Sequence, residues 1–259
     1  MGTVTSRDGT VIGFDTAGEG PPMVLVHGGT ADRTRWAPVV SRLAEHYTVH
    51  AMDRRGRGLS TDGPDYDIAR EGEDVVAVVT AAGRNVFLVG HSYGALCSLE
   101  AALRTDAIGR MVLYEPPAAT PGHDVAGPEL IAALRDAAAS REPERILNTF
   151  FRGALHLTDE QIDTMRGTAV WQARLAAAPT IVREIEHVEV FDISARLSAI
   201  TVPVRLLLGT ESPAYFRPAA EAIAAQLPDA EIVPLTGQAH LAINEDPDQF
   251  IEKVVSFGR

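Results

Sequence analysis

Residues 85–103 read NVFLVGHSYGALCSLEAAL and join two different hydrophobic patterns through a short turn. The apolar run that ends at Val89 is typical of a strand buried on both faces, and the residues that follow the turn have helical spacing. Gly90 and Gly94 flank Ser92 as in a tight strand-to-helix turn, whose central residue is held in an unfavourable backbone conformation. The stretch therefore predicts a parallel sheet with the Ser92 hydroxyl projecting from the carboxyl end of one strand.

Strand and helix patterns alternate along most of the chain, which predicts an α/β fold with a mostly parallel sheet and helices on both faces. The segment around Asp8-Gly9 alternates between apolar and polar residues, and Asp-Gly favours a hairpin turn, so we expect an antiparallel opening hairpin. Further strands are expected within residues 21–29, 47–53, 85–90, 110–115, 202–209 and 231–235, and helices within 32–47, 69–82, 94–105, 214–227 and 247–257.

This alternation stops between Pro116 and about Ile200. The segment is rich in alanine and arginine, has a helical pattern and contains no convincing strand. Because strand-like sequence lies directly on both sides of it, we expect one α/β core made of residues 1–115 and 201–259. Residues 116–200 would then be a helical insertion between two strands of the same sheet.

Composition excludes several classes of partner. The net charge of −12 argues against nucleic acid and anionic membrane surfaces, because like charges repel. Cys97 is the only cysteine, which excludes an intramolecular disulfide and a cysteine-based zinc site. The first residues lack the apolar core of a signal peptide, and the sequence has neither a metal-ligand constellation nor a glycine-rich nucleotide loop. We therefore expect a cytoplasmic protein that binds a small molecule and uses no metal or cofactor.

A serine hydroxyl needs a neighbouring base to act as a nucleophile. Of the eight histidines, His240 has the most suitable position, on a loop between the last predicted strand and the last predicted helix. Such loops at the carboxyl ends of parallel strands are where these sheets build their sites. His27 ends a buried strand and is expected to have a structural role. Ser92 and His240 are thus the candidate nucleophile and base.

Four motifs, in this order, resemble those of the α/β-hydrolase fold family. They are HGG at 27–29, DRRGRGLS at 53–60, GHSYG at 90–94 and GQAH at 237–240. The resemblance implies that the backbone N–H groups of Gly29 and Tyr93 form an oxyanion hole. It also implies that Gly90 and Gly94 shape a nucleophile elbow and that residues 116–200 form a cap.

The chain departs from this family at the position of the triad acid. The family usually places that acid three residues after the glycine that ends the penultimate strand. Here that glycine is Gly209, and the residue three positions later is Ser212. Glu211 is one candidate replacement. The other is Glu115, at the end of the strand after the nucleophile helix, where some members, notably haloalkane dehalogenases, carry their acid. We favour Glu115 because a carboxylate at the tip of a buried strand is costly unless something pairs with it.

These residues together predict acyl transfer, in which His240 takes the Ser92 proton, Ser92 attacks a carbonyl, and water releases the acid. A serine at the elbow argues against dehalogenase and epoxide hydrolase chemistry, which use a carboxylate nucleophile. The expected substrate is an ester, lactone or thioester of a small apolar molecule. Two alternatives stay open: a cofactor-free, non-hydrolytic reaction such as a cyclisation or C–C cleavage, and a ligand-binding role.

Overall fold

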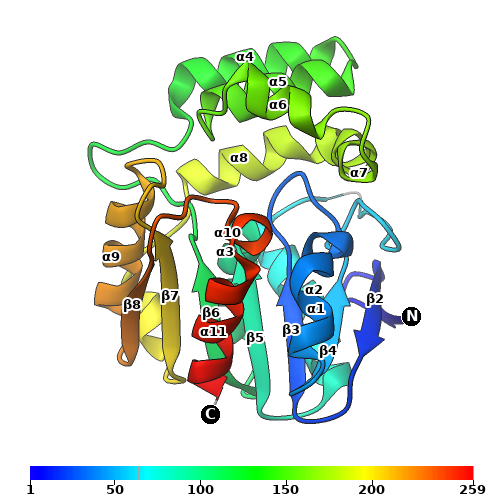
Figure 1. Cartoon of the computed structure of the whole chain (residues 1–259), viewed down its shortest axis with the longest axis vertical. Coiled ribbons are helices and arrows are strands. Elements are labelled where there is room, and N and C mark those ends of the chain that lie inside the picture. Colours follow the sequence, from blue (N-terminus) through cyan, green and yellow to red (C-terminus); the bar gives the residue numbers. More distant parts are fainter. Residues whose placement is uncertain (64, 259) are drawn as a thin grey trace.

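The protein is built on one large twisted sheet (Figure 1). The computed structural model describes residues 1–63 and 65–258, and within them eight strands pair in the order β1-β2-β4-β3-β5-β6-β7-β8. The strands are β1 (Gly2–Thr5), β2 (Val11–Ala17), β3 (Pro22–Val26), β4 (Thr48–Met52), β5 (Val86–His91), β6 (Ile108–Tyr114), β7 (Val204–Gly209) and β8 (Ala230–Leu235). The β1–β2 and β2–β4 pairs are antiparallel, and all the others are parallel. The predicted α/β fold with an opening hairpin is therefore confirmed.

Helices cover both faces and one end of this sheet (Figure 1). They are α1 (Ala37–Leu43), α2 (Ile68–Ala82), α3 (Tyr93–Ala102), α4 (Gly127–Ala139), α5 (Pro143–Gly153), α6 (Asp159–Met165), α7 (Ala169–Ala177), α8 (Ile181–Glu189), α9 (Phe216–Gln226), α10 (Ala242–Glu245) and α11 (Pro247–Gly258). Short 3₁₀ turns span Arg33–Trp36, Ala178–Thr180 and Ala195–Ala199. Among the described residues, no helix combines the length and the hydrophobicity that crossing a membrane requires.

The helix predicted over residues 32–47 is shorter than expected. Residues Arg33–Trp36 form a 3₁₀ turn whose first amides are capped by Asp32, and α1 begins only at Ala37. Pro38 explains this start, because proline lacks an N–H donor and is tolerated only in the first turn of an α-helix.

Two apolar clusters lie on opposite faces of the sheet. One packs α2, α3 and α9 against it, and the other packs α1 and α11 (Figure 1). The central strands β3 and β5 are buried almost throughout, which is why they read as continuous apolar runs and not as alternating ones.

Helices α4–α8 lie between β6 and β7 in the chain and are gathered at one end of the sheet (Figure 1). This end is the carboxyl edge of the parallel strands, because Ile181 and Ile185 of α8 line the same cavity as Ser92, which directly follows β5. We call α4–α8 the inserted helices.

The junction of β5 and α3 is packed directly against the end of β3. A Cβ atom added at Gly94 would lie 2.3 Å from the carbonyl oxygen of Val26 and 2.4 Å from that of His27. Backbone atoms cannot rotate away, so only glycine allows α3 to begin this close to the neighbouring strand.

We expect Gly94→Ala to lower the free energy of unfolding by about 1–3 kcal/mol, the typical cost of overpacking a tight site. A glycine-to-alanine change inside a helix would otherwise stabilise by up to about 1 kcal/mol. Gly153→Ala in α5 is the matched control, because its added methyl meets the end of the Leu130 side chain. Urea denaturation measures both variants. Equal stabilities for the two would contradict the packing argument.

Candidate active site

Ser92 sits in a strained turn between β5 and α3. Its backbone angles are φ 56° and ψ −127°, a region that residues other than glycine rarely adopt. The turn is fixed by two hydrogen bonds, from Ser92 N–H to the Tyr114 carbonyl and from Ala95 N–H to the Ser92 carbonyl, each 2.8 Å long. The serine therefore stands at the N-terminus of α3, where the helix dipole favours negative charge.

The loop after β3 approaches Ser92 closely. A Cβ atom at Gly28 would lie 2.8 Å from the Cβ atom of Ser92, so this position also requires glycine. The fully buried His27 holds the loop, with Nδ1 2.8 Å from the Gly28 carbonyl and Nε2 accepting from Arg54 N–H at 3.1 Å. Burial lowers the pKa of His27 well below its usual range, so the ring is neutral and has the structural position expected of it.

Glu115 and His240 meet at the carboxyl edge of the sheet. Glu115 Oε2 lies 2.6 Å from His240 Nδ1, and the carboxylate is fully buried. Its second oxygen, Oε1, accepts hydrogen bonds from Gly209 N–H at 2.8 Å and from the Ser212 hydroxyl. The His240 ring is stacked on Phe216, with ring centroids 4.7 Å apart. The carboxylate at the tip of β6 is thus compensated on both oxygens, as its burial requires.

The two alternative positions for an acid have different surroundings. Ser212, where the family usually has its carboxylate, donates its hydroxyl to Glu115 instead. Glu211 is exposed, and its carboxylate accepts from the hydroxyl of Thr210 at 3.4 Å. The contacts of the described residues therefore bring His240 to Glu115 and not to Glu211.

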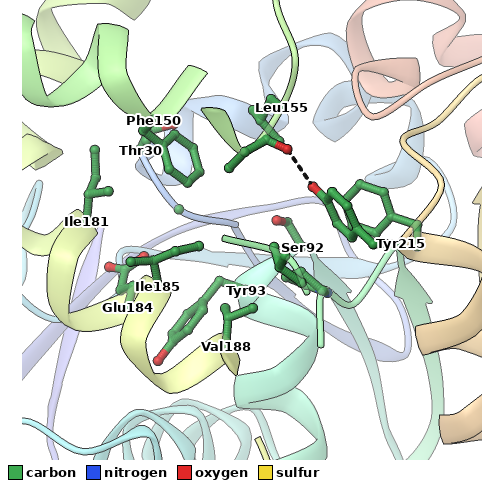
Figure 2. Close-up of a pocket in the computed structure, with 15 residues that line it drawn as sticks. Thr30, Ser92, Tyr93, Phe150, Leu155, Ile181, Glu184, Ile185, Val188 and Tyr215 are labelled. Atoms are coloured by element: carbon green, nitrogen blue, oxygen red, sulfur yellow. Dashed lines mark hydrogen bonds between the residues drawn. The ribbon is translucent and has the colours of Figure 1, made fainter. Parts of the chain in front are cut away.

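Ser92 opens into a small, mostly apolar cavity under the inserted helices (Figure 2). Gly29 and Tyr93 line it beside the serine, and side chains of α5, α8 and α9 complete its walls, among them Phe150, Ile181, Ile185, Val188 and Phe216. Its volume is about 30 Å³, enough for about two water molecules. Sequence reasoning did not rank these wall residues, because the faces that the inserted helices turn inward depend on their packing.

A buried charge cluster joins α8 to the loop after β4. Arg54 contacts Glu71, with Nε 3.0 Å from Oε2, and Glu184, with Nη2 3.1 Å from Oε1. Arg57 also pairs with Glu184. Burial opposes ionisation of Glu184, but the Arg54 and Arg57 guanidiniums outweigh it and lower the pKa of this carboxyl to about 2. Sequence reasoning missed this cluster. The signal was available, since Glu184 interrupts the apolar spacing of Ile181, Ile185 and Val188.

Comparison with known proteins agrees with this architecture. A model of the alpha/beta hydrolase family matches residues 23–253. The chain belongs to the alpha/beta hydrolase family.

This hydrolase is similar over nearly its whole length to several relatives. A solved alpha/beta hydrolase from Sphaerobacter thermophilus DSM 20745 is 34% identical, with a TM-score of 0.87 and coverage of 100% of both chains. An esterase from Rhodococcus sp. ECU1013 is 27% identical, with a TM-score of 0.80, and the match covers 99% of this chain and 97% of that one. N-formylmaleamate deformylase of Pseudomonas putida is 29% identical over 241 residues, which are 90% of this chain and 87% of that protein. These relatives support hydrolase activity.

We expect Glu184→Gln to destabilise the protein by about 3–5 kcal/mol, because it leaves the buried Arg57 without its carboxylate partner and Arg54 with Glu71 alone. Glu186→Gln on the same helix is the control. Glu186 pairs with Arg135 at 2.6 Å, but their side chains are 34% and 65% exposed. Removing a solvent-exposed ion pair should cost less than about 1 kcal/mol. Chemical denaturation compares the two variants, and a similar loss in both would argue against a stabilising role for the buried cluster.

Proposed function

We propose that this protein is a serine hydrolase that cleaves an ester, lactone or thioester of a small molecule through an acyl-enzyme. The observation that carries the proposal is the 2.6 Å contact of His240 with the buried Glu115, beside a cavity that His240 and the strained Ser92 both line. Ser92 is the proposed nucleophile, His240 the base and Glu115 the acid.

In the proposed reaction, His240 Nε2 accepts the Ser92 proton as Oγ attacks the substrate carbonyl. The backbone N–H groups of Gly29 and Tyr93 hold the resulting oxyanion, and the N-terminus of α3 adds its dipole. His240 then gives its proton to the leaving group. A water molecule, deprotonated by His240, attacks the acyl-enzyme and releases the acid product.

Glu115 acts on this reaction through His240. Its Oε2 keeps the proton on Nδ1, so that Nε2 is available to accept, and its charge stabilises the imidazolium that forms. Because Oε1 is held by Gly209 N–H and the Ser212 hydroxyl, the carboxylate cannot turn away from the ring. A fixed partner of this kind orients a base better than an exposed one such as Glu211.

The inserted helices act in this proposal as a cap, formed by residues 116–200 over a core of residues 1–115 and 201–259. Their apolar side chains favour a small substrate with an apolar part on one side of the scissile bond. The relatives include proteins named as esterases, a deformylase and an N-acyl homoserine lactone degrading enzyme, which supports carbonyl substrates of this kind.

Covalent labelling by a fluorophosphonate, followed by intact mass, tests the nucleophile and the acid together. We expect Ser92→Ala to remain unlabelled, and Glu115→Gln to react at least about tenfold more slowly, because a misoriented base activates serine poorly. Glu211→Gln is the matched control and should react like the wild type. A slow Glu211→Gln would reverse the acid assignment. A folded wild type that does not label would favour the non-hydrolytic or ligand-binding alternatives.

A rescue experiment tests whether position 212 can supply the acid. Glu115→Ala should slow fluorophosphonate labelling by at least about tenfold, and adding Ser212→Asp in the same chain should restore at least about a third of the wild-type rate. Ser212 already contacts Glu115, so an aspartate there lies near the space that the removed carboxylate vacates. Ser212→Ala in the Glu115→Ala background is the control and should restore nothing. Equal rates for the aspartate and alanine double variants would contradict the geometry.

A further inference from the structure

Two arginines face the candidate active site without an ion-pair partner among the residues that the structure describes. Arg35 comes from the 3₁₀ turn before α1, and Arg174 comes from α7 of the inserted helices. Both line a second small cavity, of about 40 Å³, which Ser92 and His240 also line. Both also line a neighbouring cavity of about 150 Å³. Core and insertion thus each contribute one guanidinium to the same place.

Neutral groups hold these two side chains in position. Arg174 donates from Nη1 to the hydroxyl of Thr30 at 2.6 Å, and its guanidinium lies 5.2 Å from the centre of the Phe151 ring. Arg35 donates from Nη1 to the side-chain oxygen of Asn244. Each guanidinium therefore has a fixed orientation and keeps donor groups for something else.

One donor nitrogen on each arginine is shielded from solvent. Arg35 Nη2 and Arg174 Nε are both buried, and neither has a hydrogen-bond partner within the described part of the chain. Neither arginine forms an ion pair with the described residues. The one carboxylate that lines the larger cavity, Asp32, accepts hydrogen bonds from Thr34. Buried, unpaired cationic donors are costly, so this arrangement calls for an anionic partner from outside the chain.

The two charges also act on each other. Burial, and then repulsion from Arg35, lowers the pKa of Arg174 to about 10. Burial likewise lowers the pKa of Arg35 to about 10, although Tyr114 and Glu245 favour its charged form. Both guanidiniums therefore remain protonated at neutral pH. An anion between them would relieve both the repulsion and the missing hydrogen bonds.

We propose that Arg35 and Arg174 form a subsite for a carboxylate of the substrate, in the cavity that they share with Ser92 and His240 and beside the apolar cavity. A carboxylate suits the site because guanidinium groups bind it through paired N–H donors. The inference rests on the proposed function and narrows its substrate class. The substrate is an ester, lactone or thioester with an apolar part on one side of the scissile bond and a carboxylate on the other.

Two pairs of esters test this subsite. They also show whether the substrate carries its carboxylate on the acyl side or on the leaving-group side of the scissile bond. Mono(4-nitrophenyl) glutarate and its terminal amide place the carboxylate, or a neutral isostere, on the acyl side. 4-Acetoxybenzoate and 4-acetoxybenzamide place the same pair of groups on the leaving-group side. In one of the two pairs, we expect the wild-type kcat/KM to be at least about tenfold higher for the carboxylate ester than for its amide counterpart. The reason is that charge-assisted hydrogen bonds are stronger than neutral ones.

Arg35→Gln and Arg174→Gln should each lower that charged-to-neutral ratio by at least about fivefold. Arg152→Gln is the matched control, because Arg152 lies on the inserted helix α5, is exposed and pairs with Asp159 at 2.8 Å. Its ratio should remain that of the wild type. Arg35→Lys and Arg174→Lys replace any glutamine variant that does not fold. They keep the charge but lose the planar fork, and should lower the ratio by at least about threefold.

Binding to Ser92→Ala, measured by calorimetry, separates the subsite from the chemistry. All four esters are compared, and the charged member of one pair should bind at least about fivefold more tightly than its neutral isostere. Adding Arg174→Gln should remove the difference. If the wild type hydrolyses no ester and is not labelled by the fluorophosphonate, the proposed function fails. The difference in binding between charged and neutral esters still shows in that case whether the subsite exists. If the neutral esters are hydrolysed but neither pair shows a preference in rate or binding, the hydrolase stands and the subsite is wrong.

Discussion

The buried carboxylate of Glu115 is the interaction on which the arrangement at the carboxyl edge of the sheet depends. It joins three separate pieces of chain: the tip of β6, the loop after β7 through Gly209 and Ser212, and the loop that carries His240. An unpaired carboxylate at this depth would cost several kcal/mol, on the order of the whole stability of a domain. Its burial is therefore tolerated only while all three pieces of chain are in place. Because His240 is on one of them, folding itself fixes the position of the His240 ring.

The two cavities that Ser92 lines differ in how their charged side chains are paired. Near α8, Arg54 and Arg57 are paired with the carboxylates of Glu184 and Glu71. These charges therefore need no ligand to neutralise them. On the side of α7, two guanidiniums lack any such partner among the described residues. The contrast is informative because the chain as a whole carries a charge of −12 and has carboxylates in excess. A site that remains cationic in such a chain is well suited to receive an anion from solution.

Residues with strict local requirements could be predicted from the sequence. Ser92 lies in a turn whose two glycines mark it, and Glu115 stands out because a carboxylate ends an apolar strand. The hairpin and the parallel sheet followed from periodicity and are confirmed. Arg174 could not be assigned, because an amphipathic helix shows which residues share a face but not what that face meets. The binding role of Arg174, like the catalytic role of Glu115, stays a prediction.

Sheet geometry explains why a carboxylate at the tip of β6 can reach the same place as one on the loop after β7. The two strands are parallel neighbours, with Tyr114 opposite Leu207, and Glu115 N–H continues the ladder to the Leu207 carbonyl at 3.1 Å. Their carboxyl ends therefore emerge side by side, and both face the loop that carries His240. Glu115 reaches the ring with φ 48°, a conformation that costs a residue other than glycine about 1 kcal/mol or more. The hydroxyl of Ser212 and the amide of Gly209 offset that strain, so the end of β7 and the loop after it hold the Glu115 carboxylate in place.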